Sequence, residues 1–168
     1  MWTDEQGAEV LGLLECRRLL ALGAKEGRHG HLGVPDDAGP VVLPVNYAMH
    51  GPDVVVLVGE HLFARLAGSN VAFQVDDVTL PRPYLGEAGT QHWSVLVRGL
   101  AIEETAAAVD GHLPLPEVPA PGTRVVRIRA DAVSGRRFGV VPSPTDTAPG
   151  SEPAGKVLAF RNPASSAR

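Results

Sequence analysis

The sequence predicts a mainly β fold, a β-barrel with helical additions, and three observations lead to it. Roughly six short stretches have the aliphatic or alternating pattern of strands, and turn-forming residues separate them. The one long helical pattern stands near the N-terminus, and the other helical stretches are short. No glycine-rich phosphate loop of the dinucleotide or nucleoside-triphosphate type is present. These features favour a barrel over a parallel α/β sheet.

The first predicted element is a helix over residues 4–22. Thr3 and Gln6 have the spacing of a capping box, and Gly23 stands where a left-handed residue often ends a helix. Between them, apolar residues recur at helical spacing. They are Val10, Leu13, Leu14, Cys16, Leu19 and Leu20. The thiol on this stripe is expected to be buried and inert.

Short strands follow this helix. Residues 31–34 and 41–49 flank a turn rich in Pro, Asp and Gly, so they should form a hairpin. The continuous aliphatic run 54–58 predicts a strand that is buried on both faces. A short helix over residues 60–66 should come next and end at Gly68.

The remaining part of the sequence contains further predicted strands. Strands are predicted over residues 71–75 and 93–103, and a loop over residues 78–91 joins them. A brief helical or irregular connection over 105–113 precedes the last predicted strand, residues 123–129. In that strand Val and Ile alternate with Arg, which indicates one buried and one solvated or interface face.

Length and composition suit a small globular domain with a tail. The chain has 168 residues, and we predict a domain over 1–141 followed by a tail over 142–168. The tail is rich in Pro, Ser and Ala and has too little apolar surface to offset its ordering entropy, so it should be mostly disordered. The net charge of −4 argues against a nucleic-acid partner.

The compartment expected from the sequence is the cytoplasm. The first residues, Met1–Glu5, are acidic where a signal peptide would be basic. No apolar run approaches the roughly 18 residues that a membrane-spanning helix needs, so we expect no membrane partner. The single cysteine, Cys16, cannot form an internal disulfide.

The residues by themselves indicate no catalytic side chain and no metal site. Ser94 lies in a strand pattern without the G-x-S-x-G elbow of a nucleophile. His29 and His31 lack further ligands at a known metal-binding spacing, which favours solvated histidines near a turn. Asp76 and Asp77 would point to opposite faces of a strand, which favours a structural role over a pair of acids.

Several segments in a fixed order carry a resemblance that covers approximately residues 9–138. They are Glu-Cys-Arg-Arg-Leu-Leu, Gly-His-Leu-Gly, Pro-Val-Asn-Tyr, Val-Ala-Phe-Gln-Val-Asp-Asp, Trp-Ser-Val-Leu-Val-Arg-Gly and Ser-Gly-Arg-Arg. In this order the chain resembles the flavin-binding split β-barrel family that includes pyridoxamine 5'-phosphate oxidase-like proteins. The resemblance implies a six-stranded antiparallel split barrel, a homodimer, and FMN bound in grooves between the subunits.

The same resemblance implies a set of cofactor-binding residues. Val45, Asn46 and Tyr47 match the family segment that runs alongside the flavin ring. Trp93 and Ser94 match the segment that reaches the site from another barrel edge. The alternative is that Tyr47 and Trp93 are ordinary core aromatics.

At the phosphate end, the chain departs from the family pattern. The strand 54–58 carries neither the Arg nor the Thr that family members often have at its end. His61 stands where the family has a lysine, and a neutral histidine is a weaker anchor for phosphate. Arg65, one helical turn further on, could supply the missing charge.

Two functional hypotheses follow from the resemblance, beside the alternative of an unrelated function on a similar barrel, because a fold does not determine function. The first is an FMN-dependent oxidoreductase that acts on an unidentified small molecule, with the flavin carrying the redox chemistry. The second is a split-barrel protein that has lost FMN and holds another cofactor, such as a deazaflavin or haem, or acts as a dimeric interaction module. The missing phosphate-binding residues motivate the second hypothesis.

Overall fold

The computed structural model describes residues 3–4, 8–79, 90–109, 113–114 and 122–141. The predicted tail and most of the predicted loop over 78–91 lie outside the described residues. In chain order the elements are β1 (Glu9–Leu11), α1 (Leu13–Lys25), β2 (His29–Val34), β3 (Val41–His50), β4 (Asp53–Val58), α2 (Glu60–Leu66), β5 (Asn70–Thr79), β6 (Thr90–Glu104), the 3-10 helix η2 (Ala106–Val109), β7 (Arg124–Ile128) and β8 (Ala132–Val141).

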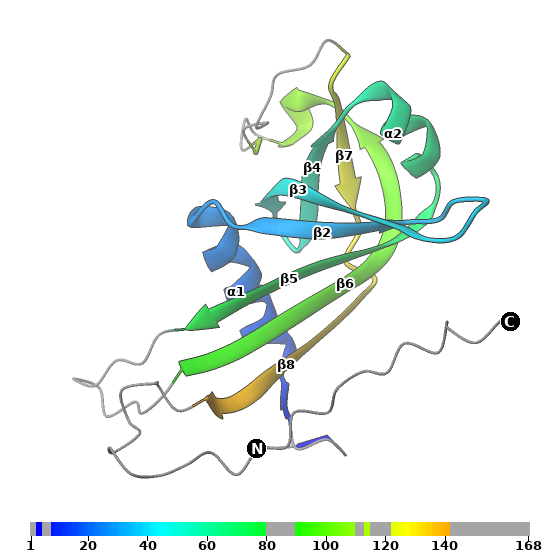
Figure 1. The fold of residues 1–168 in the computed structure, drawn as a ribbon. Coiled ribbons are helices and arrows are strands. Elements are labelled where there is room, and N and C mark those ends of the chain that lie inside the picture. Colours follow the sequence, from blue (N-terminus) through cyan, green and yellow to red (C-terminus); the bar gives the residue numbers. More distant parts are fainter. Residues whose placement is uncertain (1–2, 5–7, 80–89, 110–112, 115–121, 142–168) are drawn as a thin grey trace, which may run out of the picture.

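Six of the strands close into a ring (Figure 1). The antiparallel pairs of the ring are β2–β3, β3–β4, β4–β7, β7–β6, β6–β5 and β5–β2. β8 pairs with β6, and β1 pairs with β8, so these two strands extend the sheet beyond the ring. The predicted six-stranded antiparallel barrel with helical additions is therefore confirmed.

The longest strand, β6, belongs to both parts of this sheet. Its first half pairs with β8, as in Arg98 opposite Ala132, and its last residues pair with β7, as in Ala101 opposite Ile128. The change of partner occurs at Gly99, where a Cβ atom would overlap the carbonyl oxygen of Arg129. A glycine is therefore required for the chain between β7 and β8 to pass this close to β6.

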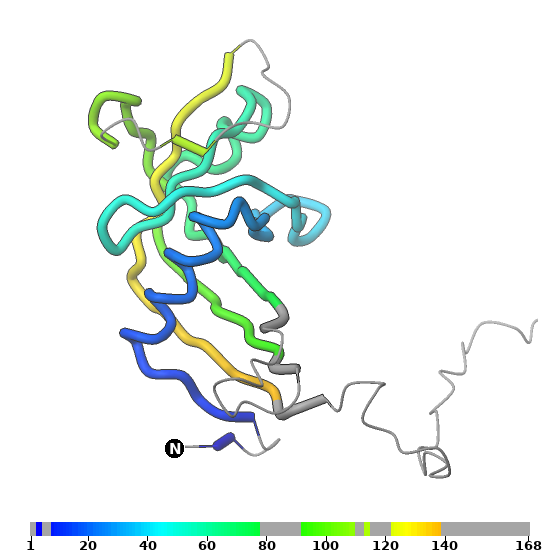
Figure 2. Tube along the Cα trace, turned by 90° about the vertical axis from the view of Figure 1, so that its left-hand side faces the viewer, coloured from blue at the N-terminus to red at the C-terminus, as the bar shows by residue number. Residues whose placement is uncertain are grey.

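Helix α1 covers one side of β5, β6 and β8 (Figure 2). Its buried residues Cys16, Leu19 and Leu20 join the core together with Tyr47 and Phe73. The two aromatic rings meet edge to face, with their centroids 5.0 Å apart. On the opposite side of β5, β6 and β8 lies no helix among the described residues, so that face of the sheet is open.

The prediction of the N-terminal helix was wrong at both ends. Residues 9–11 form strand β1, because they pair with β8 and the Arg137 guanidinium contacts both Glu9 and Glu15 at 2.9 Å. Thr3 forms a bridge with Glu9 in place of a helix cap. Gly23 lies within α1, where a Cβ would overlap the Tyr47 hydroxyl, and Gly27, with φ of 69°, follows the helix instead.

The expectation that the strand at 123–129 is the last one was also wrong, because β8 follows it. The sequence pattern of β8 is weak for a physical reason. Gly135 occupies an inward-facing position where a Cβ would lie 2.6 Å from the Cys16 sulfur atom. Close packing of α1 on β8 therefore requires a glycine where strand patterning expects a larger apolar residue.

Other predicted elements are confirmed. The hairpin of β2 and β3 is present, and helix α2 spans the predicted residues 60–66. Val54, Val55 and Val56 are fully buried, as expected for a strand that is covered on both faces. In β7, Val126 and Ile128 are buried while Arg127 between them is not. No described helix is long and apolar enough to cross a membrane.

Candidate functional site

The open sheet face carries a cavity that the described residues line, and it is larger than three other cavities along this part of the chain. It is a groove of about 690 Å³ between the β2–β3 turn and the bend that leads into β8. This volume lies in the range of pockets that hold small ligands and cofactors. We call this cavity the sheet groove. Most of the side chains that line it are apolar or small. They are Gly33, Val34, Pro35, Pro40, Val42, Asn70, Val71, Ala72, Arg98, Gly99, Asp131 and Ala132.

A single cross-strand row forms the floor of the sheet groove. Val42 on β3 lies opposite Gly33, Gly33 opposite Ala72, Ala72 opposite Arg98, and Arg98 opposite Ala132. Because Gly33 and Ala72 stand side by side in this row, the groove floor is shallow and flat between Val42 and Arg98. A flat surface of this kind suits a planar heterocycle.

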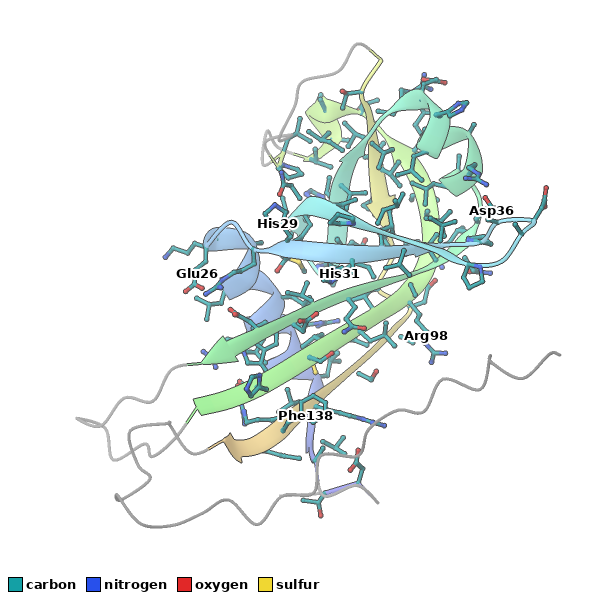
Figure 3. The ribbon with its side chains drawn as sticks, in the orientation of Figure 1. Glu26, His29, His31, Asp36, Arg98 and Phe138 are labelled. Atoms are coloured by element: carbon teal, nitrogen blue, oxygen red, sulfur yellow. The ribbon has the colours of Figure 1, made fainter. Side chains whose placement is uncertain are left out.

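Arg98 is the one side chain of that row that carries a charge. It is exposed and extends away from β6 (Figure 3), and it has no hydrogen bond or ion pair with any residue that the structure describes. The only carboxylate in the groove lining, Asp131, accepts hydrogen bonds from Arg129 at 2.9 Å and from the Leu100 backbone N–H at 3.3 Å. The hydrogen bonds from Arg129 lower the pKa of the Asp131 carboxyl.

Trp93 and Ser94, two of the predicted site residues, line a second cavity of about 460 Å³. Gln74, Asp76, Asp77, His92 and Phe138 complete its lining. The Trp93 side chain is buried in the core, whereas Ser94 is half-buried. With two carboxylates and no arginine or lysine in the lining, this cavity is unfavourable for a phosphate.

Asn46 and Tyr47 line a third cavity of about 450 Å³ beside the end of α1, together with Lys25 and Arg28. Tyr47 is 4% exposed and donates its hydroxyl hydrogen to the Leu20 carbonyl, which is the geometry of a core aromatic. Burial raises the pKa of the Tyr47 hydroxyl. The neighbouring Val45 is partly buried against the core and lines none of the four cavities.

The predicted phosphate end lies around α2, and its cations are already paired. Arg65 forms an ion pair with Asp36 in the β2–β3 turn, and both line a fourth cavity of about 390 Å³. Arg124, which stacks on Phe63 of α2, contacts Glu60 at 3.3 Å and also Glu103. His61 is exposed and lines none of the four cavities.

These contacts test whether a flavin phosphate fits where the resemblance placed it. A dianionic phosphate near α2 would have to displace carboxylates from the two arginines, and His61 is a weak substitute for a lysine. The α2 end therefore does not fit a phosphate well. The sheet groove, in contrast, offers a flat surface for a ring and a cation, Arg98, that pairs with none of the described residues.

The seven predicted site residues thus do not line one common cavity. The structure brings Trp93 together with Ser94, and Asn46 together with Tyr47, but none of the seven lines the sheet groove. Sequence reasoning missed the groove and Arg98. A signal was present in the alternation of small and apolar residues in β2, β5 and β8, but it becomes visible only once the strand order is known.

Cys16 is buried, and the described side chains that could bind a metal ion do not cluster. Cys16 is fully buried and burial raises the pKa of its thiol, which confirms the expected buried cysteine. Within the described part of the chain, His, Cys, Asp and Glu side chains do not gather in groups of three or more that could hold a metal ion.

The fold and the open groove define a class of protein, the split-barrel proteins related to pyridoxamine 5'-phosphate oxidase. The family model described as pyridoxamine 5'-phosphate oxidase matches residues 14–137. The chain therefore belongs to the pyridoxamine 5'-phosphate oxidase family. No curated protein sequence matches it.

Solved structures with the same fold come from several bacteria. The FAD-binding protein of Mycobacterium smegmatis is 26% identical, with a TM-score of 0.59 over 78% of this chain and 100% of that one. An FAD-binding protein of Mesorhizobium loti is 22% identical, with a TM-score of 0.61 over 79% and 99%. The FAD and haem binding protein of M. smegmatis is 16% identical, with a TM-score of 0.53 over 87% and 91%.

Proposed function

We propose that this chain is a flavin-dependent oxidoreductase that acts on a small molecule and works as a homodimer. The observation that carries the proposal is the sheet groove, a flat apolar surface of about 690 Å³ in a chain that belongs to this family. FMN is the flavin that the resemblance implies, and FAD is the next candidate because three similar structures are described as FAD-binding.

In this proposal the side chains of the groove make room for the ring and contact its edge. Gly33 and Ala72 leave room for a planar ring to lie against the sheet, and Val42, Pro35 and Pro40 at one end of the groove would contact the edge of the ring. The bound flavin would supply the hydride chemistry itself. What remains for the protein is to orient the ring and to shield it from water.

The homodimer is supported by the open sheet face. Outward-facing Leu96 is half-buried in the single chain, and Val42 and Phe138 at the two ends of this face are 62% and 44% exposed. The described elements leave the face uncovered, and a second copy of the chain would bury these apolar groups. Two copies that meet here would also close the groove over a bound ring.

A second candidate function is a split-barrel protein that binds a cofactor other than FMN, such as a deazaflavin or haem. The pairing of Arg65 with Asp36 and of Arg124 with Glu60 favours it, because these arginines are not free to hold the FMN phosphate near α2. In both cases the same surface of the sheet would hold the planar group.

The absorption spectrum of the purified protein tests the two candidates. A yellow preparation that releases its chromophore on denaturation supports the flavin proposal, and a Soret band supports haem. A colourless protein that does not quench added FMN or FAD fluorescence would contradict the oxidoreductase. Reduction of the loaded protein and its reoxidation by air would show that the bound flavin is redox-active.

A matched pair of variants then tests the position of the ring. Ala72→Leu would fill the floor of the groove, so we expect flavin affinity to fall at least about tenfold, the effect of a severe steric overlap. Ala21→Leu adds the same side chain at an exposed position of α1 and should leave affinity unchanged. Equal affinities for the two variants would place the flavin elsewhere.

A further inference from the structure

We infer that Arg98 is the anchor for the anionic group of the ligand in the sheet groove, and that the phosphate of a flavin nucleotide binds there and not near α2. This inference rests on the proposed function, because it names the residue that determines which flavins the groove accepts. It places the phosphate at strand β6, whereas the family resemblance places it near helix α2.

The first argument is the surroundings of Arg98. Its cross-strand neighbours are Ala72 on β5 and Ala132 on β8, and neither can pair with a guanidinium. The side chain is exposed and has no hydrogen bond or ion pair with a described residue. An arginine that stands alone at the centre of an apolar groove is therefore available to a ligand.

The second argument is the state of the other charged groups near the groove. Asp131 is the only carboxylate in its lining, and Arg129 and the Leu100 N–H already occupy that carboxylate. Arg65, beyond Pro35 at the end of the groove, is paired with Asp36. The positive charge that remains for an incoming anion is that of Arg98.

The third argument is the chemistry of the guanidinium group. Its planar fork of N–H donors matches the oxygen atoms of a phosphate, and two parallel hydrogen bonds fix orientation as well as adding affinity. The apolar floor next to it would hold the ring by contact and by exclusion of water. The groove therefore selects a flat aromatic molecule that carries an anion.

The test compares ligands with and without the anion on three proteins. The proteins are the wild type, Arg98→Gln, and Arg17→Gln as a control that removes another exposed arginine, from α1. The flavin pair is FMN and riboflavin, which differ by the phosphate. The second pair is the aromatic sulfonate 8-anilinonaphthalene-1-sulfonate and the neutral dye Nile red, which do not depend on a flavin site.

We expect Arg98→Gln to weaken FMN binding at least about tenfold, the size of a lost charge-assisted contact, and to change riboflavin binding less than twofold. The sulfonate should lose affinity in the same variant while Nile red does not. Arg17→Gln should match the wild type with all four ligands. Higher salt should weaken FMN binding to the wild type more than to Arg98→Gln.

The outcomes separate this inference from the proposed function. If the wild type binds no flavin but binds the sulfonate through Arg98, the flavin proposal is wrong and the anion anchor is supported. If FMN binds equally well to wild type and Arg98→Gln, or if riboflavin and Nile red weaken as much as FMN and the sulfonate, the anchor is wrong whatever the cofactor. If circular dichroism shows that Arg98→Gln has lost secondary structure, the same comparison is made with Arg98→Lys. That variant must restore at least part of the FMN affinity.

Discussion

The hydroxyl of Tyr47 on β3 donates a 2.8 Å hydrogen bond to the backbone carbonyl of Leu20 on α1. Both residues are buried, and Gly23 one turn later provides the space for the hydroxyl. The contact holds the helix against the barrel. It also explains why a residue that the family resemblance assigned to the flavin serves the core in this chain.

Burial of Tyr47 makes stability depend on alkaline pH. Desolvation, and secondarily the charge of Asp77, raise the pKa of the hydroxyl above the value of about 10 in an unfolded chain. Above that pH the unfolded state loses this proton and the folded state keeps it. The free energy of unfolding should then fall by up to about 1.4 kcal/mol per pH unit.

The measurement is urea unfolding of the wild type and Tyr47→Phe at a series of alkaline pH values. Below about pH 9 the variant should be less stable by about 1–2 kcal/mol, because the Leu20 carbonyl loses its partner. The difference should shrink as the pH rises, since only the wild type carries this titration. A difference that stays constant over the whole range would show that Tyr47 titrates normally.

The same substitution at two glycines of β2 should reduce stability to very different extents. A Cβ at Gly30 would overlap the fully buried ring of Phe73, whereas a Cβ at Gly33 would meet its nearest atom, the Ala72 carbonyl oxygen, at 3.5 Å. Gly30→Ala should therefore cost about 1–3 kcal/mol or more, and Gly33→Ala less than about 0.5 kcal/mol. Thermal unfolding of both variants checks this, and similar losses would contradict the packing seen here.

Much of the barrel could be predicted because its strands have strong local patterns. The aliphatic run of β4, the punctuated hairpin of β2 and β3 and the alternation in β7 each indicate their structure without knowledge of the rest. β1 and β8 could not be found in this way. Their pairing depends on ion pairs of Arg137 and on the fit of Gly135 against Cys16, which are contacts between distant parts of the chain.

The candidate site was less predictable than the fold, and the reason is also physical. Arg98 can be recognised as a candidate ligand-binding residue only when its neighbours on β5 and β8 are known to be alanines. The sequence alone does not give that register. In the same way, Arg65 could be proposed as a phosphate ligand from helical spacing. Its partner Asp36 lies 29 positions earlier in the chain (65 − 36 = 29), in the β2–β3 turn. Only the structure shows that these two residues form an ion pair.

The pairing of Asp36 with Arg65 should weaken the positive potential that Arg65 contributes to an anion bound at Arg98 in the nearby groove. Asp36→Asn would release the guanidinium near the end of the groove, so FMN affinity should rise by about two- to tenfold while riboflavin affinity stays constant. The control is Asp37→Asn, which removes the same charge from the same turn at an exposed residue. Fluorescence titration measures all four affinities. Equal gains in both variants would indicate a general change in surface charge, and no gain would show that Arg65 does not reach the ligand.

The proposed dimer can be tested at Leu96, which lies at the centre of the open sheet face between Gln74 and Ser134. A lysine here would place an unpaired charge in the interface, so we expect the dissociation constant to rise at least about a hundredfold in Leu96→Lys. The control, Leu14→Lys, introduces the same charge at a residue of α1 that is 82% exposed.

Sedimentation velocity should show a dimer for the wild type and for Leu14→Lys, and a monomer for Leu96→Lys that retains its circular dichroism spectrum. Because the same face carries the groove, the monomer should also bind flavin more weakly, since one side of the ring would be open to water. A dimeric Leu96→Lys, or a monomeric wild type, would show that this face is not where two copies meet, and the groove would then have to hold its ligand without a second subunit.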